Sequence, residues 1–321
     1  MRHRHALLIG LALIVAAPAG HAQPYPVRTI RLIVPNAPSG VADFSARLVA
    51  AKLTDALGQQ VIVDNRVGAG GTLGTAAAVK SPPDGYTLIV VFDSHATNPS
   101  LFRHLEYDTV NDLAAVSLLV RGPMLLVVHP SLAGVSTVRD FAALAAARPG
   151  VLNFATVGPG SPARLMMELL RLEARIDVTM VPYKGAALAL TDLMSGQVDA
   201  MFAAISSAGA YVKAGRLRAL AVTSIKPTAL APGLPTMAET YPGFRTEVWS
   251  GMLAPAKTPP AIIARLNAEL GKILAHPEMR ARLAEFGLEP AGGTPAQFDL
   301  WIRTEIERWG KVIRTQKITL E

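Results

Sequence analysis

Strand–turn–helix units recur along this chain, and their recurrence constrains the fold more than any other feature. In the first unit, the apolar run 30–34 predicts a strand, the Pro- and Gly-containing residues 35–40 predict a turn, and apolar residues at helical spacing predict a helix that ends at Leu57. Similar units follow at 61–79, 152–173 and 178–194. Strands that alternate with helices in this way predict an α/β fold.

The turns of these units are suited to bind an anion. A turn that leads into a helix leaves backbone N–H groups unpaired, and the helix dipole adds partial positive charge at the same point. An ordinary turn is the alternative for any single unit, but the repetition favours binding. The sequence contains neither of the glycine-rich phosphate-binding motifs, G-x-x-x-x-G-K-[ST] and G-x-G-x-x-G. Residues 68–74 come close to a dinucleotide fingerprint, but Leu73 replaces its last glycine, so we interpret them as a closely packed helix start, with a nucleotide site as the alternative.

The first 22 residues are typical of a secretory signal peptide. A basic start precedes an apolar run at 6–17, and Gly20 and Ala22 provide small residues before a cleavage point. We predict cleavage after Ala22, a periplasmic location and no membrane insertion of the mature chain. Loss of Arg2 and Arg4 would lower the formal net charge from +7 to +5.

Composition narrows the classes of function. Charged residues make up 17% of the chain and basic residues are not clustered, which disfavours a nucleic-acid partner and allows mild steering of anions. There is no cysteine, so no disulfide supports the fold, and no G-x-S-x-G motif. Histidines 95, 104, 129 and 276 lack metal-ligand spacing. We therefore predict no catalytic residues, no metal and no cofactor. His95, which follows a predicted strand, is either a general base or a packing residue.

Motifs along the chain resemble those of the Bug family, the extracytoplasmic solute receptors of tripartite tricarboxylate transporters. The resemblance covers nearly the whole mature chain and rests on residues 33–35 with Gly40 and Asp43, 65–71, 83–86, 98–99, 181–185, 196–199, 217–223 and 253–255. It implies two α/β domains of the type II-like periplasmic binding protein fold. Each domain would be a mostly parallel sheet flanked by helices, with a two-strand hinge and the ligand in the interdomain cleft.

The resemblance also implies domain boundaries, a function and partners. Residues 23–121 and 251–321 would form the first domain, and 122–250 the second. The chain would capture a small carboxylate and deliver it to a membrane permease of the tripartite tricarboxylate transporter type, and we expect a monomer. A ligand sensor that serves a sensor kinase is the alternative, and a periplasmic enzyme is a less favoured one.

Family positions suggest which residues grip the ligand, largely through backbone N–H groups. In the first domain they are Asn36, Ala37, Ser39, Gly40, Val41, Ala42, Asp43, Asp93, Ser94 and His95. In the second they are Thr156, Gly158, Gly160, Ser161, Arg164, Lys184, Gly185, Ala186 and Ala203.

Three of these residues have open roles. Asp43 either caps the helix that it begins or contacts the ligand. Arg164, where the family often has histidine, points either into the cleft or into solvent. Ala203 lacks a carboxylate that is frequent one residue after Met-Phe in the family, and we hypothesise that Asp93 replaces that charge.

Overall fold

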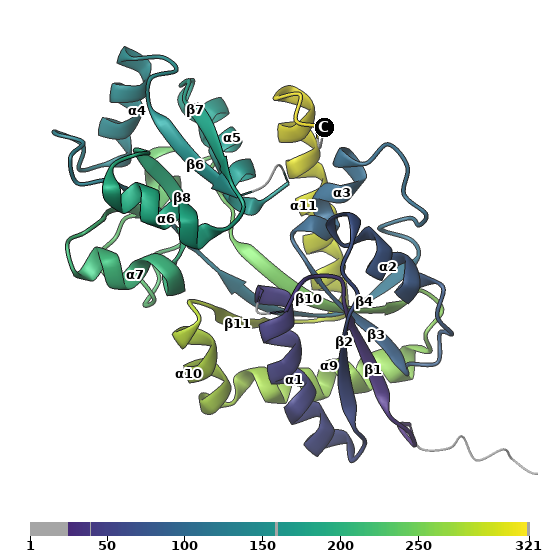
Figure 1. Cartoon of the computed structure of the whole chain (residues 1–321). Coiled ribbons are helices and arrows are strands. Elements are labelled where there is room, and N and C mark those ends of the chain that lie inside the picture. The colour runs from purple at the N-terminus through teal and green to yellow at the C-terminus, as the bar shows by residue number, and fades with distance from the viewer. Residues whose placement is uncertain (1–24, 39, 158–159, 320–321) are drawn as a thin grey trace, which may run out of the picture.

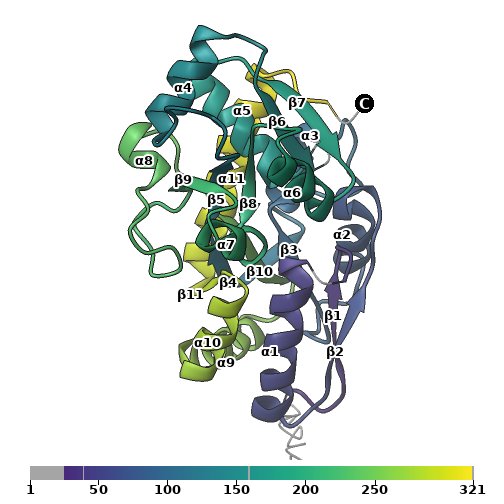
Figure 2. The ribbon, with the colours of Figure 1, turned by 60° about the vertical axis from the view of Figure 1, so that its left-hand side comes forward.

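The chain folds into two α/β domains, each built on its own sheet (Figures 1 and 2). The computed structural model describes residues 25–38, 40–157 and 160–319. Its elements, in chain order, are β1 (Ile30–Val34), α1 (Val41–Leu57), β2 (Val61–Asn65), the 3₁₀ turn η1 (Ala69–Gly71), α2 (Thr72–Val79), β3 (Thr87–Phe92), α3 (Ser94–Leu101), β4 (Leu113–Gly122), β5 (Met124–Val128), α4 (Val138–Ala147), β6 (Asn153–Val157), α5 (Pro162–Ala174), β7 (Thr179–Tyr183), α6 (Ala186–Ser195), β8 (Ala200–Ala204), α7 (Ile205–Lys213), β9 (Arg218–Val222), α8 (Met237–Thr240), β10 (Val248–Pro255), α9 (Pro260–Ala275), α10 (Pro277–Glu285), β11 (Glu289–Gly292) and α11 (Pro295–Thr315).

The first domain holds six strands in the order β11-β4-β10-β3-β1-β2. Strands β1, β2 and β3 pair in parallel, whereas β10 runs antiparallel to both β3 and β4, and β11 runs antiparallel to β4. Helices α1 and α9 cover one face, and α2, α3 and α11 cover the other (Figure 1). The strands are buried on both faces, as their almost continuous apolar sequences require.

The second domain holds five strands in the order β7-β6-β8-β5-β9. Successive side chains of β8 point to opposite faces of the sheet and so belong to two cores. Phe202 packs in the core that α4 and α5 cover, whereas Met201 and Ala203 pack in the core that α6 and α7 cover. Strands β6, β7 and β8 are parallel, and β5 pairs antiparallel to β8 and β9. The predicted two-domain α/β fold is confirmed. Most strands of each described sheet run in one direction, and the sheets are mixed because β10 and β11 run against the others in the first sheet and β5 does so in the second.

The chain passes between the sheets at two places. Strand β4 ends in the first sheet at Gly122, and β5 begins in the second at Met124, with only Pro123 between them. The return crossing follows β9 and leads into β10, whose first residue Val248 pairs with Gly122. Helix α11 runs beside both domains and packs on α3 and α5 (Figure 1). The hinge is therefore narrow and buttressed by one long helix.

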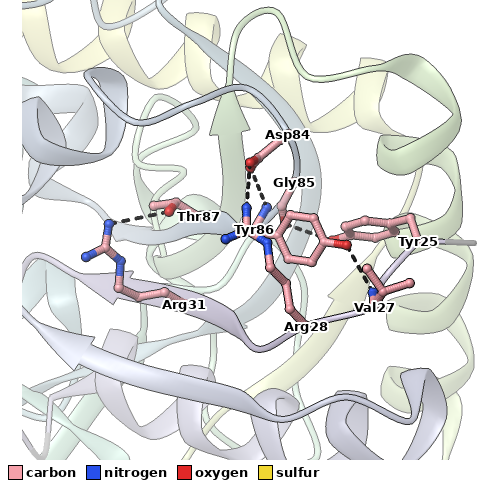
Figure 3. Close-up of polar contacts among 8 residues, drawn as sticks. All are labelled: Tyr25, Val27, Arg28, Arg31, Asp84, Gly85, Tyr86 and Thr87. Atoms are coloured by element: carbon pink, nitrogen blue, oxygen red, sulfur yellow. Dashed lines mark hydrogen bonds and ion pairs between the residues drawn. The ribbon is translucent and has the colours of Figure 1, made fainter. Parts of the chain in front are cut away.

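The first described residues are fastened to the far end of the first sheet (Figure 3). Tyr25 Oη donates to the Gly85 carbonyl at 2.8 Å, and Val27 N donates to Tyr86 Oη at 3.0 Å. Arg28 pairs with Asp84 at 2.8 Å and stacks over the Tyr86 ring at 4.1 Å. These contacts tie the start of the described chain to the first sheet. The predicted signal peptide, 1–22, lies outside the described residues. Among the residues that are described, no helix combines the length and apolar character needed to span a bilayer.

Candidate functional site

A pocket of about 510 Å³ lies where turns of the two domains meet. Its described lining comes from η1 and α3 in the first domain and from the β6–α5 turn in the second: Ala69, Gly70, Ser94, Thr97, Asn98, Leu101, Phe102, Val157, Gly160 and Ser161. Strands β3 and β6 both end at this pocket. Ligands in open α/β sheets bind in crevices at such carboxyl ends.

Helix α3 forms most of the first-domain wall. It begins directly after β3 and presents Ser94, Thr97 and Asn98 to the pocket on successive turns. Asn98 Nδ2 donates to the Gly70 carbonyl at 3.1 Å and so fixes η1 against α3. Gly70 has a φ of 63°, in the left-handed region that favours glycine. This small-residue turn lets backbone, instead of side chains, form the edge of the pocket.

The start of α5 forms the second-domain wall. Ser161 is its N-cap and accepts a hydrogen bond from Arg164 N at 3.3 Å, and Pro162 occupies the first helical position. A serine N-cap followed by proline is a combination that favours a helix start. Helix α5 has thirteen residues, so its dipole adds positive potential beside Gly160 and Ser161.

The described lining of the pocket carries no charged side chain. Its polar groups are hydroxyls, one carboxamide and backbone at the starts of α3 and α5, and Leu101, Phe102 and Val157 add apolar surface. An anion here would be held by dipoles and hydrogen bonds, which cost no desolvation of a resident charge. Across 25–38, 40–157 and 160–319, no group of three or more His, Asp or Glu side chains is arranged to hold a metal ion.

His95 lies beneath the pocket and is buried, with 3% of its surface exposed. It lines a crevice too narrow to admit a water molecule, and within the described residues neither ring nitrogen makes a hydrogen bond of ordinary geometry. Burial lowers the pKa of His95 to about 4, and a weak contact with the Thr109 backbone opposes that shift. The residue is a neutral packing histidine at neutral pH, which is one of the two alternatives that the sequence left open.

Asp93 precedes α3 but does not line the pocket. Its side chain is buried, and Oδ1 accepts a hydrogen bond from Trp249 N in the hinge strand β10 at 3.1 Å. The structure therefore directs this carboxyl to the hinge strand and not into the pocket. The hypothesis that Asp93 replaces a ligand-facing charge finds no geometric support.

The residues at 36–43 that were predicted to bind the ligand are not among the described residues that line this pocket. Ser39 itself lies outside the described residues. Ala37 and Gly40 are exposed, Asn36 and Val41 are half-buried, and Ala42 is buried in the core. Gly40 is the N-cap of α1. Asp43 accepts hydrogen bonds from Arg47 Nε at 3.0 Å and from Asn65 Nδ2 at 2.9 Å, so it fastens α1 to β2, a role that sequence reasoning missed.

Some of the site residues predicted in the second domain line the pocket and others lie away from it. Gly160 and Ser161 line the pocket, Thr156 is buried just before it in β6, and Gly158 lies outside the described residues. Lys184, Gly185 and Ala186 surround the start of α6 and do not reach this pocket.

Arg164 and Ala203 also lie away from the lining. Arg164 is half-buried and lies 3.8 Å from Glu168 on its own helix, so it points neither into the pocket nor freely into solvent. Ala203 is packed in the core of the second domain at 2% exposure and does not line this pocket.

Seven of the described lining residues were not among the predicted site residues: Ala69, Gly70, Thr97, Asn98, Leu101, Phe102 and Val157. The sequence held a signal for the glycines, since 68–74 was interpreted as a closely packed helix start. That interpretation is confirmed, because a Cβ at Gly74 would lie 2.7 Å from the Arg66 carbonyl and 2.8 Å from Pro35 Cβ. Only the tertiary packing of η1 on α3 shows that this turn also borders a pocket.

Comparison with known proteins identifies the group to which this architecture belongs. The sequence profile described as "Tripartite tricarboxylate transporter family receptor" matches residues 45–318. The chain belongs to this receptor family. Protein BugT of Bordetella pertussis is 39% identical over 303 residues, covering 94% of this chain and 92% of BugT. The resemblance to the Bug family is therefore confirmed.

Solved receptors of similar sequence share the fold. An R. palustris protein with adipate superposes with a TM-score of 0.78 at 36% identity, covering 92% of this chain and 99% of that one. MatC from Rhodopseudomonas palustris with bound malate has a TM-score of 0.74 at 33% identity, covering 90% and 100%. The first is described with adipate and the second with bound malate, and both molecules are carboxylates.

Proposed function

We propose that this receptor captures a small carboxylate between its two domains and delivers it to a membrane permease of the tripartite tricarboxylate transporter type. The observation that carries the proposal is the pocket whose two walls, at the starts of α3 and α5, come from different domains and hold no charged side chain. The adipate and malate in the two R. palustris relatives support the same ligand class.

The lining suits a carboxylate with an apolar body. The carboxylate group would accept hydrogen bonds from the helix starts and from Ser94 and Ser161, while Leu101, Phe102 and Val157 would contact methylene or ring carbons. Each hydrogen bond to a charged group contributes about 1.5–3 kcal/mol. About four of them contribute about 6–12 kcal/mol, and the contacts to the apolar body of the ligand add to this total to offset the cost of association.

Because the walls belong to different domains, the ligand makes its full set of contacts only when the domains are close together. A ligand that binds the closed arrangement more tightly shifts the population toward it. The crossings at Gly122–Met124 and at the start of β10 provide the narrow connection that such a movement needs. Closure would also remove water from the hydrogen bonds to the carboxylate and so strengthen them.

We further propose the boundaries expected from the sequence, with 23–121 and 251–321 in the first domain and 122–250 in the second. The sheets support these boundaries to within residues 248–250, which already pair in the first sheet as part of β10. We propose that the mature chain begins after Ala22 and is periplasmic. The fastening of Tyr25 to the fold supports a mature start shortly before it.

The test is a thermal-shift screen of the mature chain against adipate, malate, benzoate and acidic amino acids, followed by calorimetry. A ligand present at 100 times its Kd stabilises the fold by about 2.7 kcal/mol. We expect at least one carboxylate to raise the melting temperature and Ser161→Ala to weaken its binding at least fivefold. Ser195→Ala, at the exposed end of α6, is the control and should bind like the wild type. No shift with any carboxylate would contradict the proposal.

A second assay addresses delivery. Carboxylate uptake by cells that carry the permease should require the receptor and should fall with Ser161→Ala in proportion to the loss of affinity. Uptake that is the same without the receptor would instead favour the sensor-kinase alternative.

A further inference from the structure

Asp93 joins the hinge to the pocket. It is the residue between β3 and α3, and the next residue, Ser94, lines the pocket. The carboxyl is 5% exposed, and Oδ1 accepts the backbone N–H of Trp249 at 3.1 Å. Trp249 is the second residue of β10, where the chain has just returned from the second domain. One side chain therefore connects the hinge strand to the helix that forms the pocket wall.

The surroundings of Asp93 are tightly packed. Trp249 is fully buried, and its indole meets the Phe298 ring of α11 edge to face at 5.9 Å. Next to these residues, Ser250 of β10 pairs with Phe92 of β3 and holds the two strands together. Asp93 therefore cannot turn toward solvent without disturbing this packing.

The carboxyl group of Asp93 has one hydrogen-bond donor and no cation. Its Oδ2 is buried without a partner in the part of the chain that the structure describes. Glu305 of α11, at 1% exposure, differs: Arg308 Nη1 donates to one of its oxygens at 2.5 Å and Trp309 Nε1 to the other at 3.0 Å. An ionised carboxylate at position 93 would be buried without compensation, which is costly.

Charged groups on neighbouring elements also disfavour the ionised form of Asp93. Burial, and then the charge of Glu305, raise the pKa of Asp93 well above its usual range, and the Trp249 N–H opposes the shift. Behind Glu305, Glu247 lies 3.6 Å from Arg121 of β4, and burial raises the pKa of this carboxyl as well. On α3 itself, His95 is neutral. No cation in the described surroundings bonds to Asp93.

We propose that, at a pH at which Asp93 is ionised in the unliganded receptor, its carboxylate takes up a proton when the pocket binds its carboxylate ligand, so that ligand binding and the protonation of Asp93 are coupled. The inference rests on the proposed function. A negative charge at Asp93, one residue from the pocket, repels a bound carboxylate through a poorly screened interior. By linkage, the ligand favours the protonated form and the protonated form favours the ligand. Asp93 is thus a positioning residue whose proton tunes affinity, without contact with the ligand.

The test measures adipate binding by calorimetry between pH 6.5 and 9, in two buffers of different ionisation enthalpy. Adipate is fully ionised in this range, which begins about two units above the ordinary pKa of a carboxyl group. We expect proton uptake of up to one per ligand, and an affinity that falls by up to tenfold per pH unit above the titration of Asp93. Malate and benzoate are tested in the same way.

Variants separate the coupling from a structural role. Asp93→Asn keeps an oxygen that accepts the Trp249 N–H but cannot ionise, so proton uptake should disappear and the affinity should become independent of pH. Glu305→Gln removes the neighbouring charge and should move the wild-type profile to lower pH. Glu285→Gln, whose side chain is 64% exposed on α10, is the control and should keep the wild-type profile.

The failures of the two proposals are distinguishable. If adipate, malate and benzoate all fail to bind, both the proposed carboxylate function and the coupling are overturned. If one of them binds without proton uptake and with a flat profile, or if Asp93→Asn retains the wild-type profile, the coupling alone is overturned.

Discussion

Acidification should weaken this fold through His95, and the size of the effect follows from its burial. His95 is 3% exposed, and among the described residues neither ring nitrogen makes a hydrogen bond of ordinary geometry, so its burial disfavours the charged form. The pKa of His95 is about 4 in the fold, against 6.5 for an ordinary histidine. Because the folded-state pKa is depressed, this residue's full stabilisation is present above about pH 6.5 and is lost as the pH falls toward 4.

The shift of 6.5 − 4 = 2.5 pH units corresponds to about 3 kcal/mol at pH 4, since each unit is worth about 1.36 kcal/mol and the folded form is itself half protonated there. This is a large fraction of the stability of a typical domain. Buried carboxyls such as Asp93 have raised pKa values and change stability in the opposite direction, so the effect of His95 has to be isolated by a variant.

Urea unfolding of the wild type and of His95→Gln, at pH 7.5 and at pH 4, isolates it. Any packing cost of the substitution is present at both pH values and cancels in the comparison. The free energy of unfolding of the wild type should fall about 3 kcal/mol further between the two pH values than that of the variant. His104→Gln, at an exposed position, should behave like the wild type. Equal losses in the wild type and His95→Gln would refute the reasoning.

Two further predictions concern packing. Gly251→Ala would place a Cβ 2.1 Å from the Phe298 ring and should lower the free energy of unfolding by about 3 kcal/mol, whereas Gly271→Ala, with open space in α9, should raise it by about 0.5–1 kcal/mol; urea titration compares them. Tyr25→Phe removes the 2.8 Å hydrogen bond to the Gly85 carbonyl and should cost about 1 kcal/mol, so an unchanged urea midpoint would contradict the proposed fastening of the mature start.

Much of the fold was predictable because local patterns and tertiary structure agree. The strand–turn–helix units predicted at 61–79, 152–173 and 178–194 coincide with β2 and α2, β6 and α5, and β7 and α6. The elements that were missed have weak local signals. Helix α3 contains Pro99, α7 follows β8 without a turn residue, and β11 is a four-residue strand of Glu, Pro, Ala and Gly. Their structure depends on the packing around them.

The candidate site was predictable only in part. Ser161 and Pro162 form a local signal for the start of a helix. Helix α5 begins at that point, and Ser161 lines the pocket. Asp93 and Asp43 could not be placed, because a carboxyl at a turn can face a ligand or the core, and only the positions of Trp249 and Asn65 decide between them. The start of α5 borders the same pocket as α3, and not the start of α1, because of how the two domains pack against each other.

The central claim is that helix starts from both domains hold one carboxylate. A crystal structure of the mature chain with the carboxylate that gives the largest thermal shift tests it most directly. We predict a carboxylate within hydrogen-bonding distance of the α5 start at Gly160–Ser161 and of the η1–α3 wall at Gly70 or Ser94. A ligand that contacts only one domain, or that binds outside this pocket, would contradict the account.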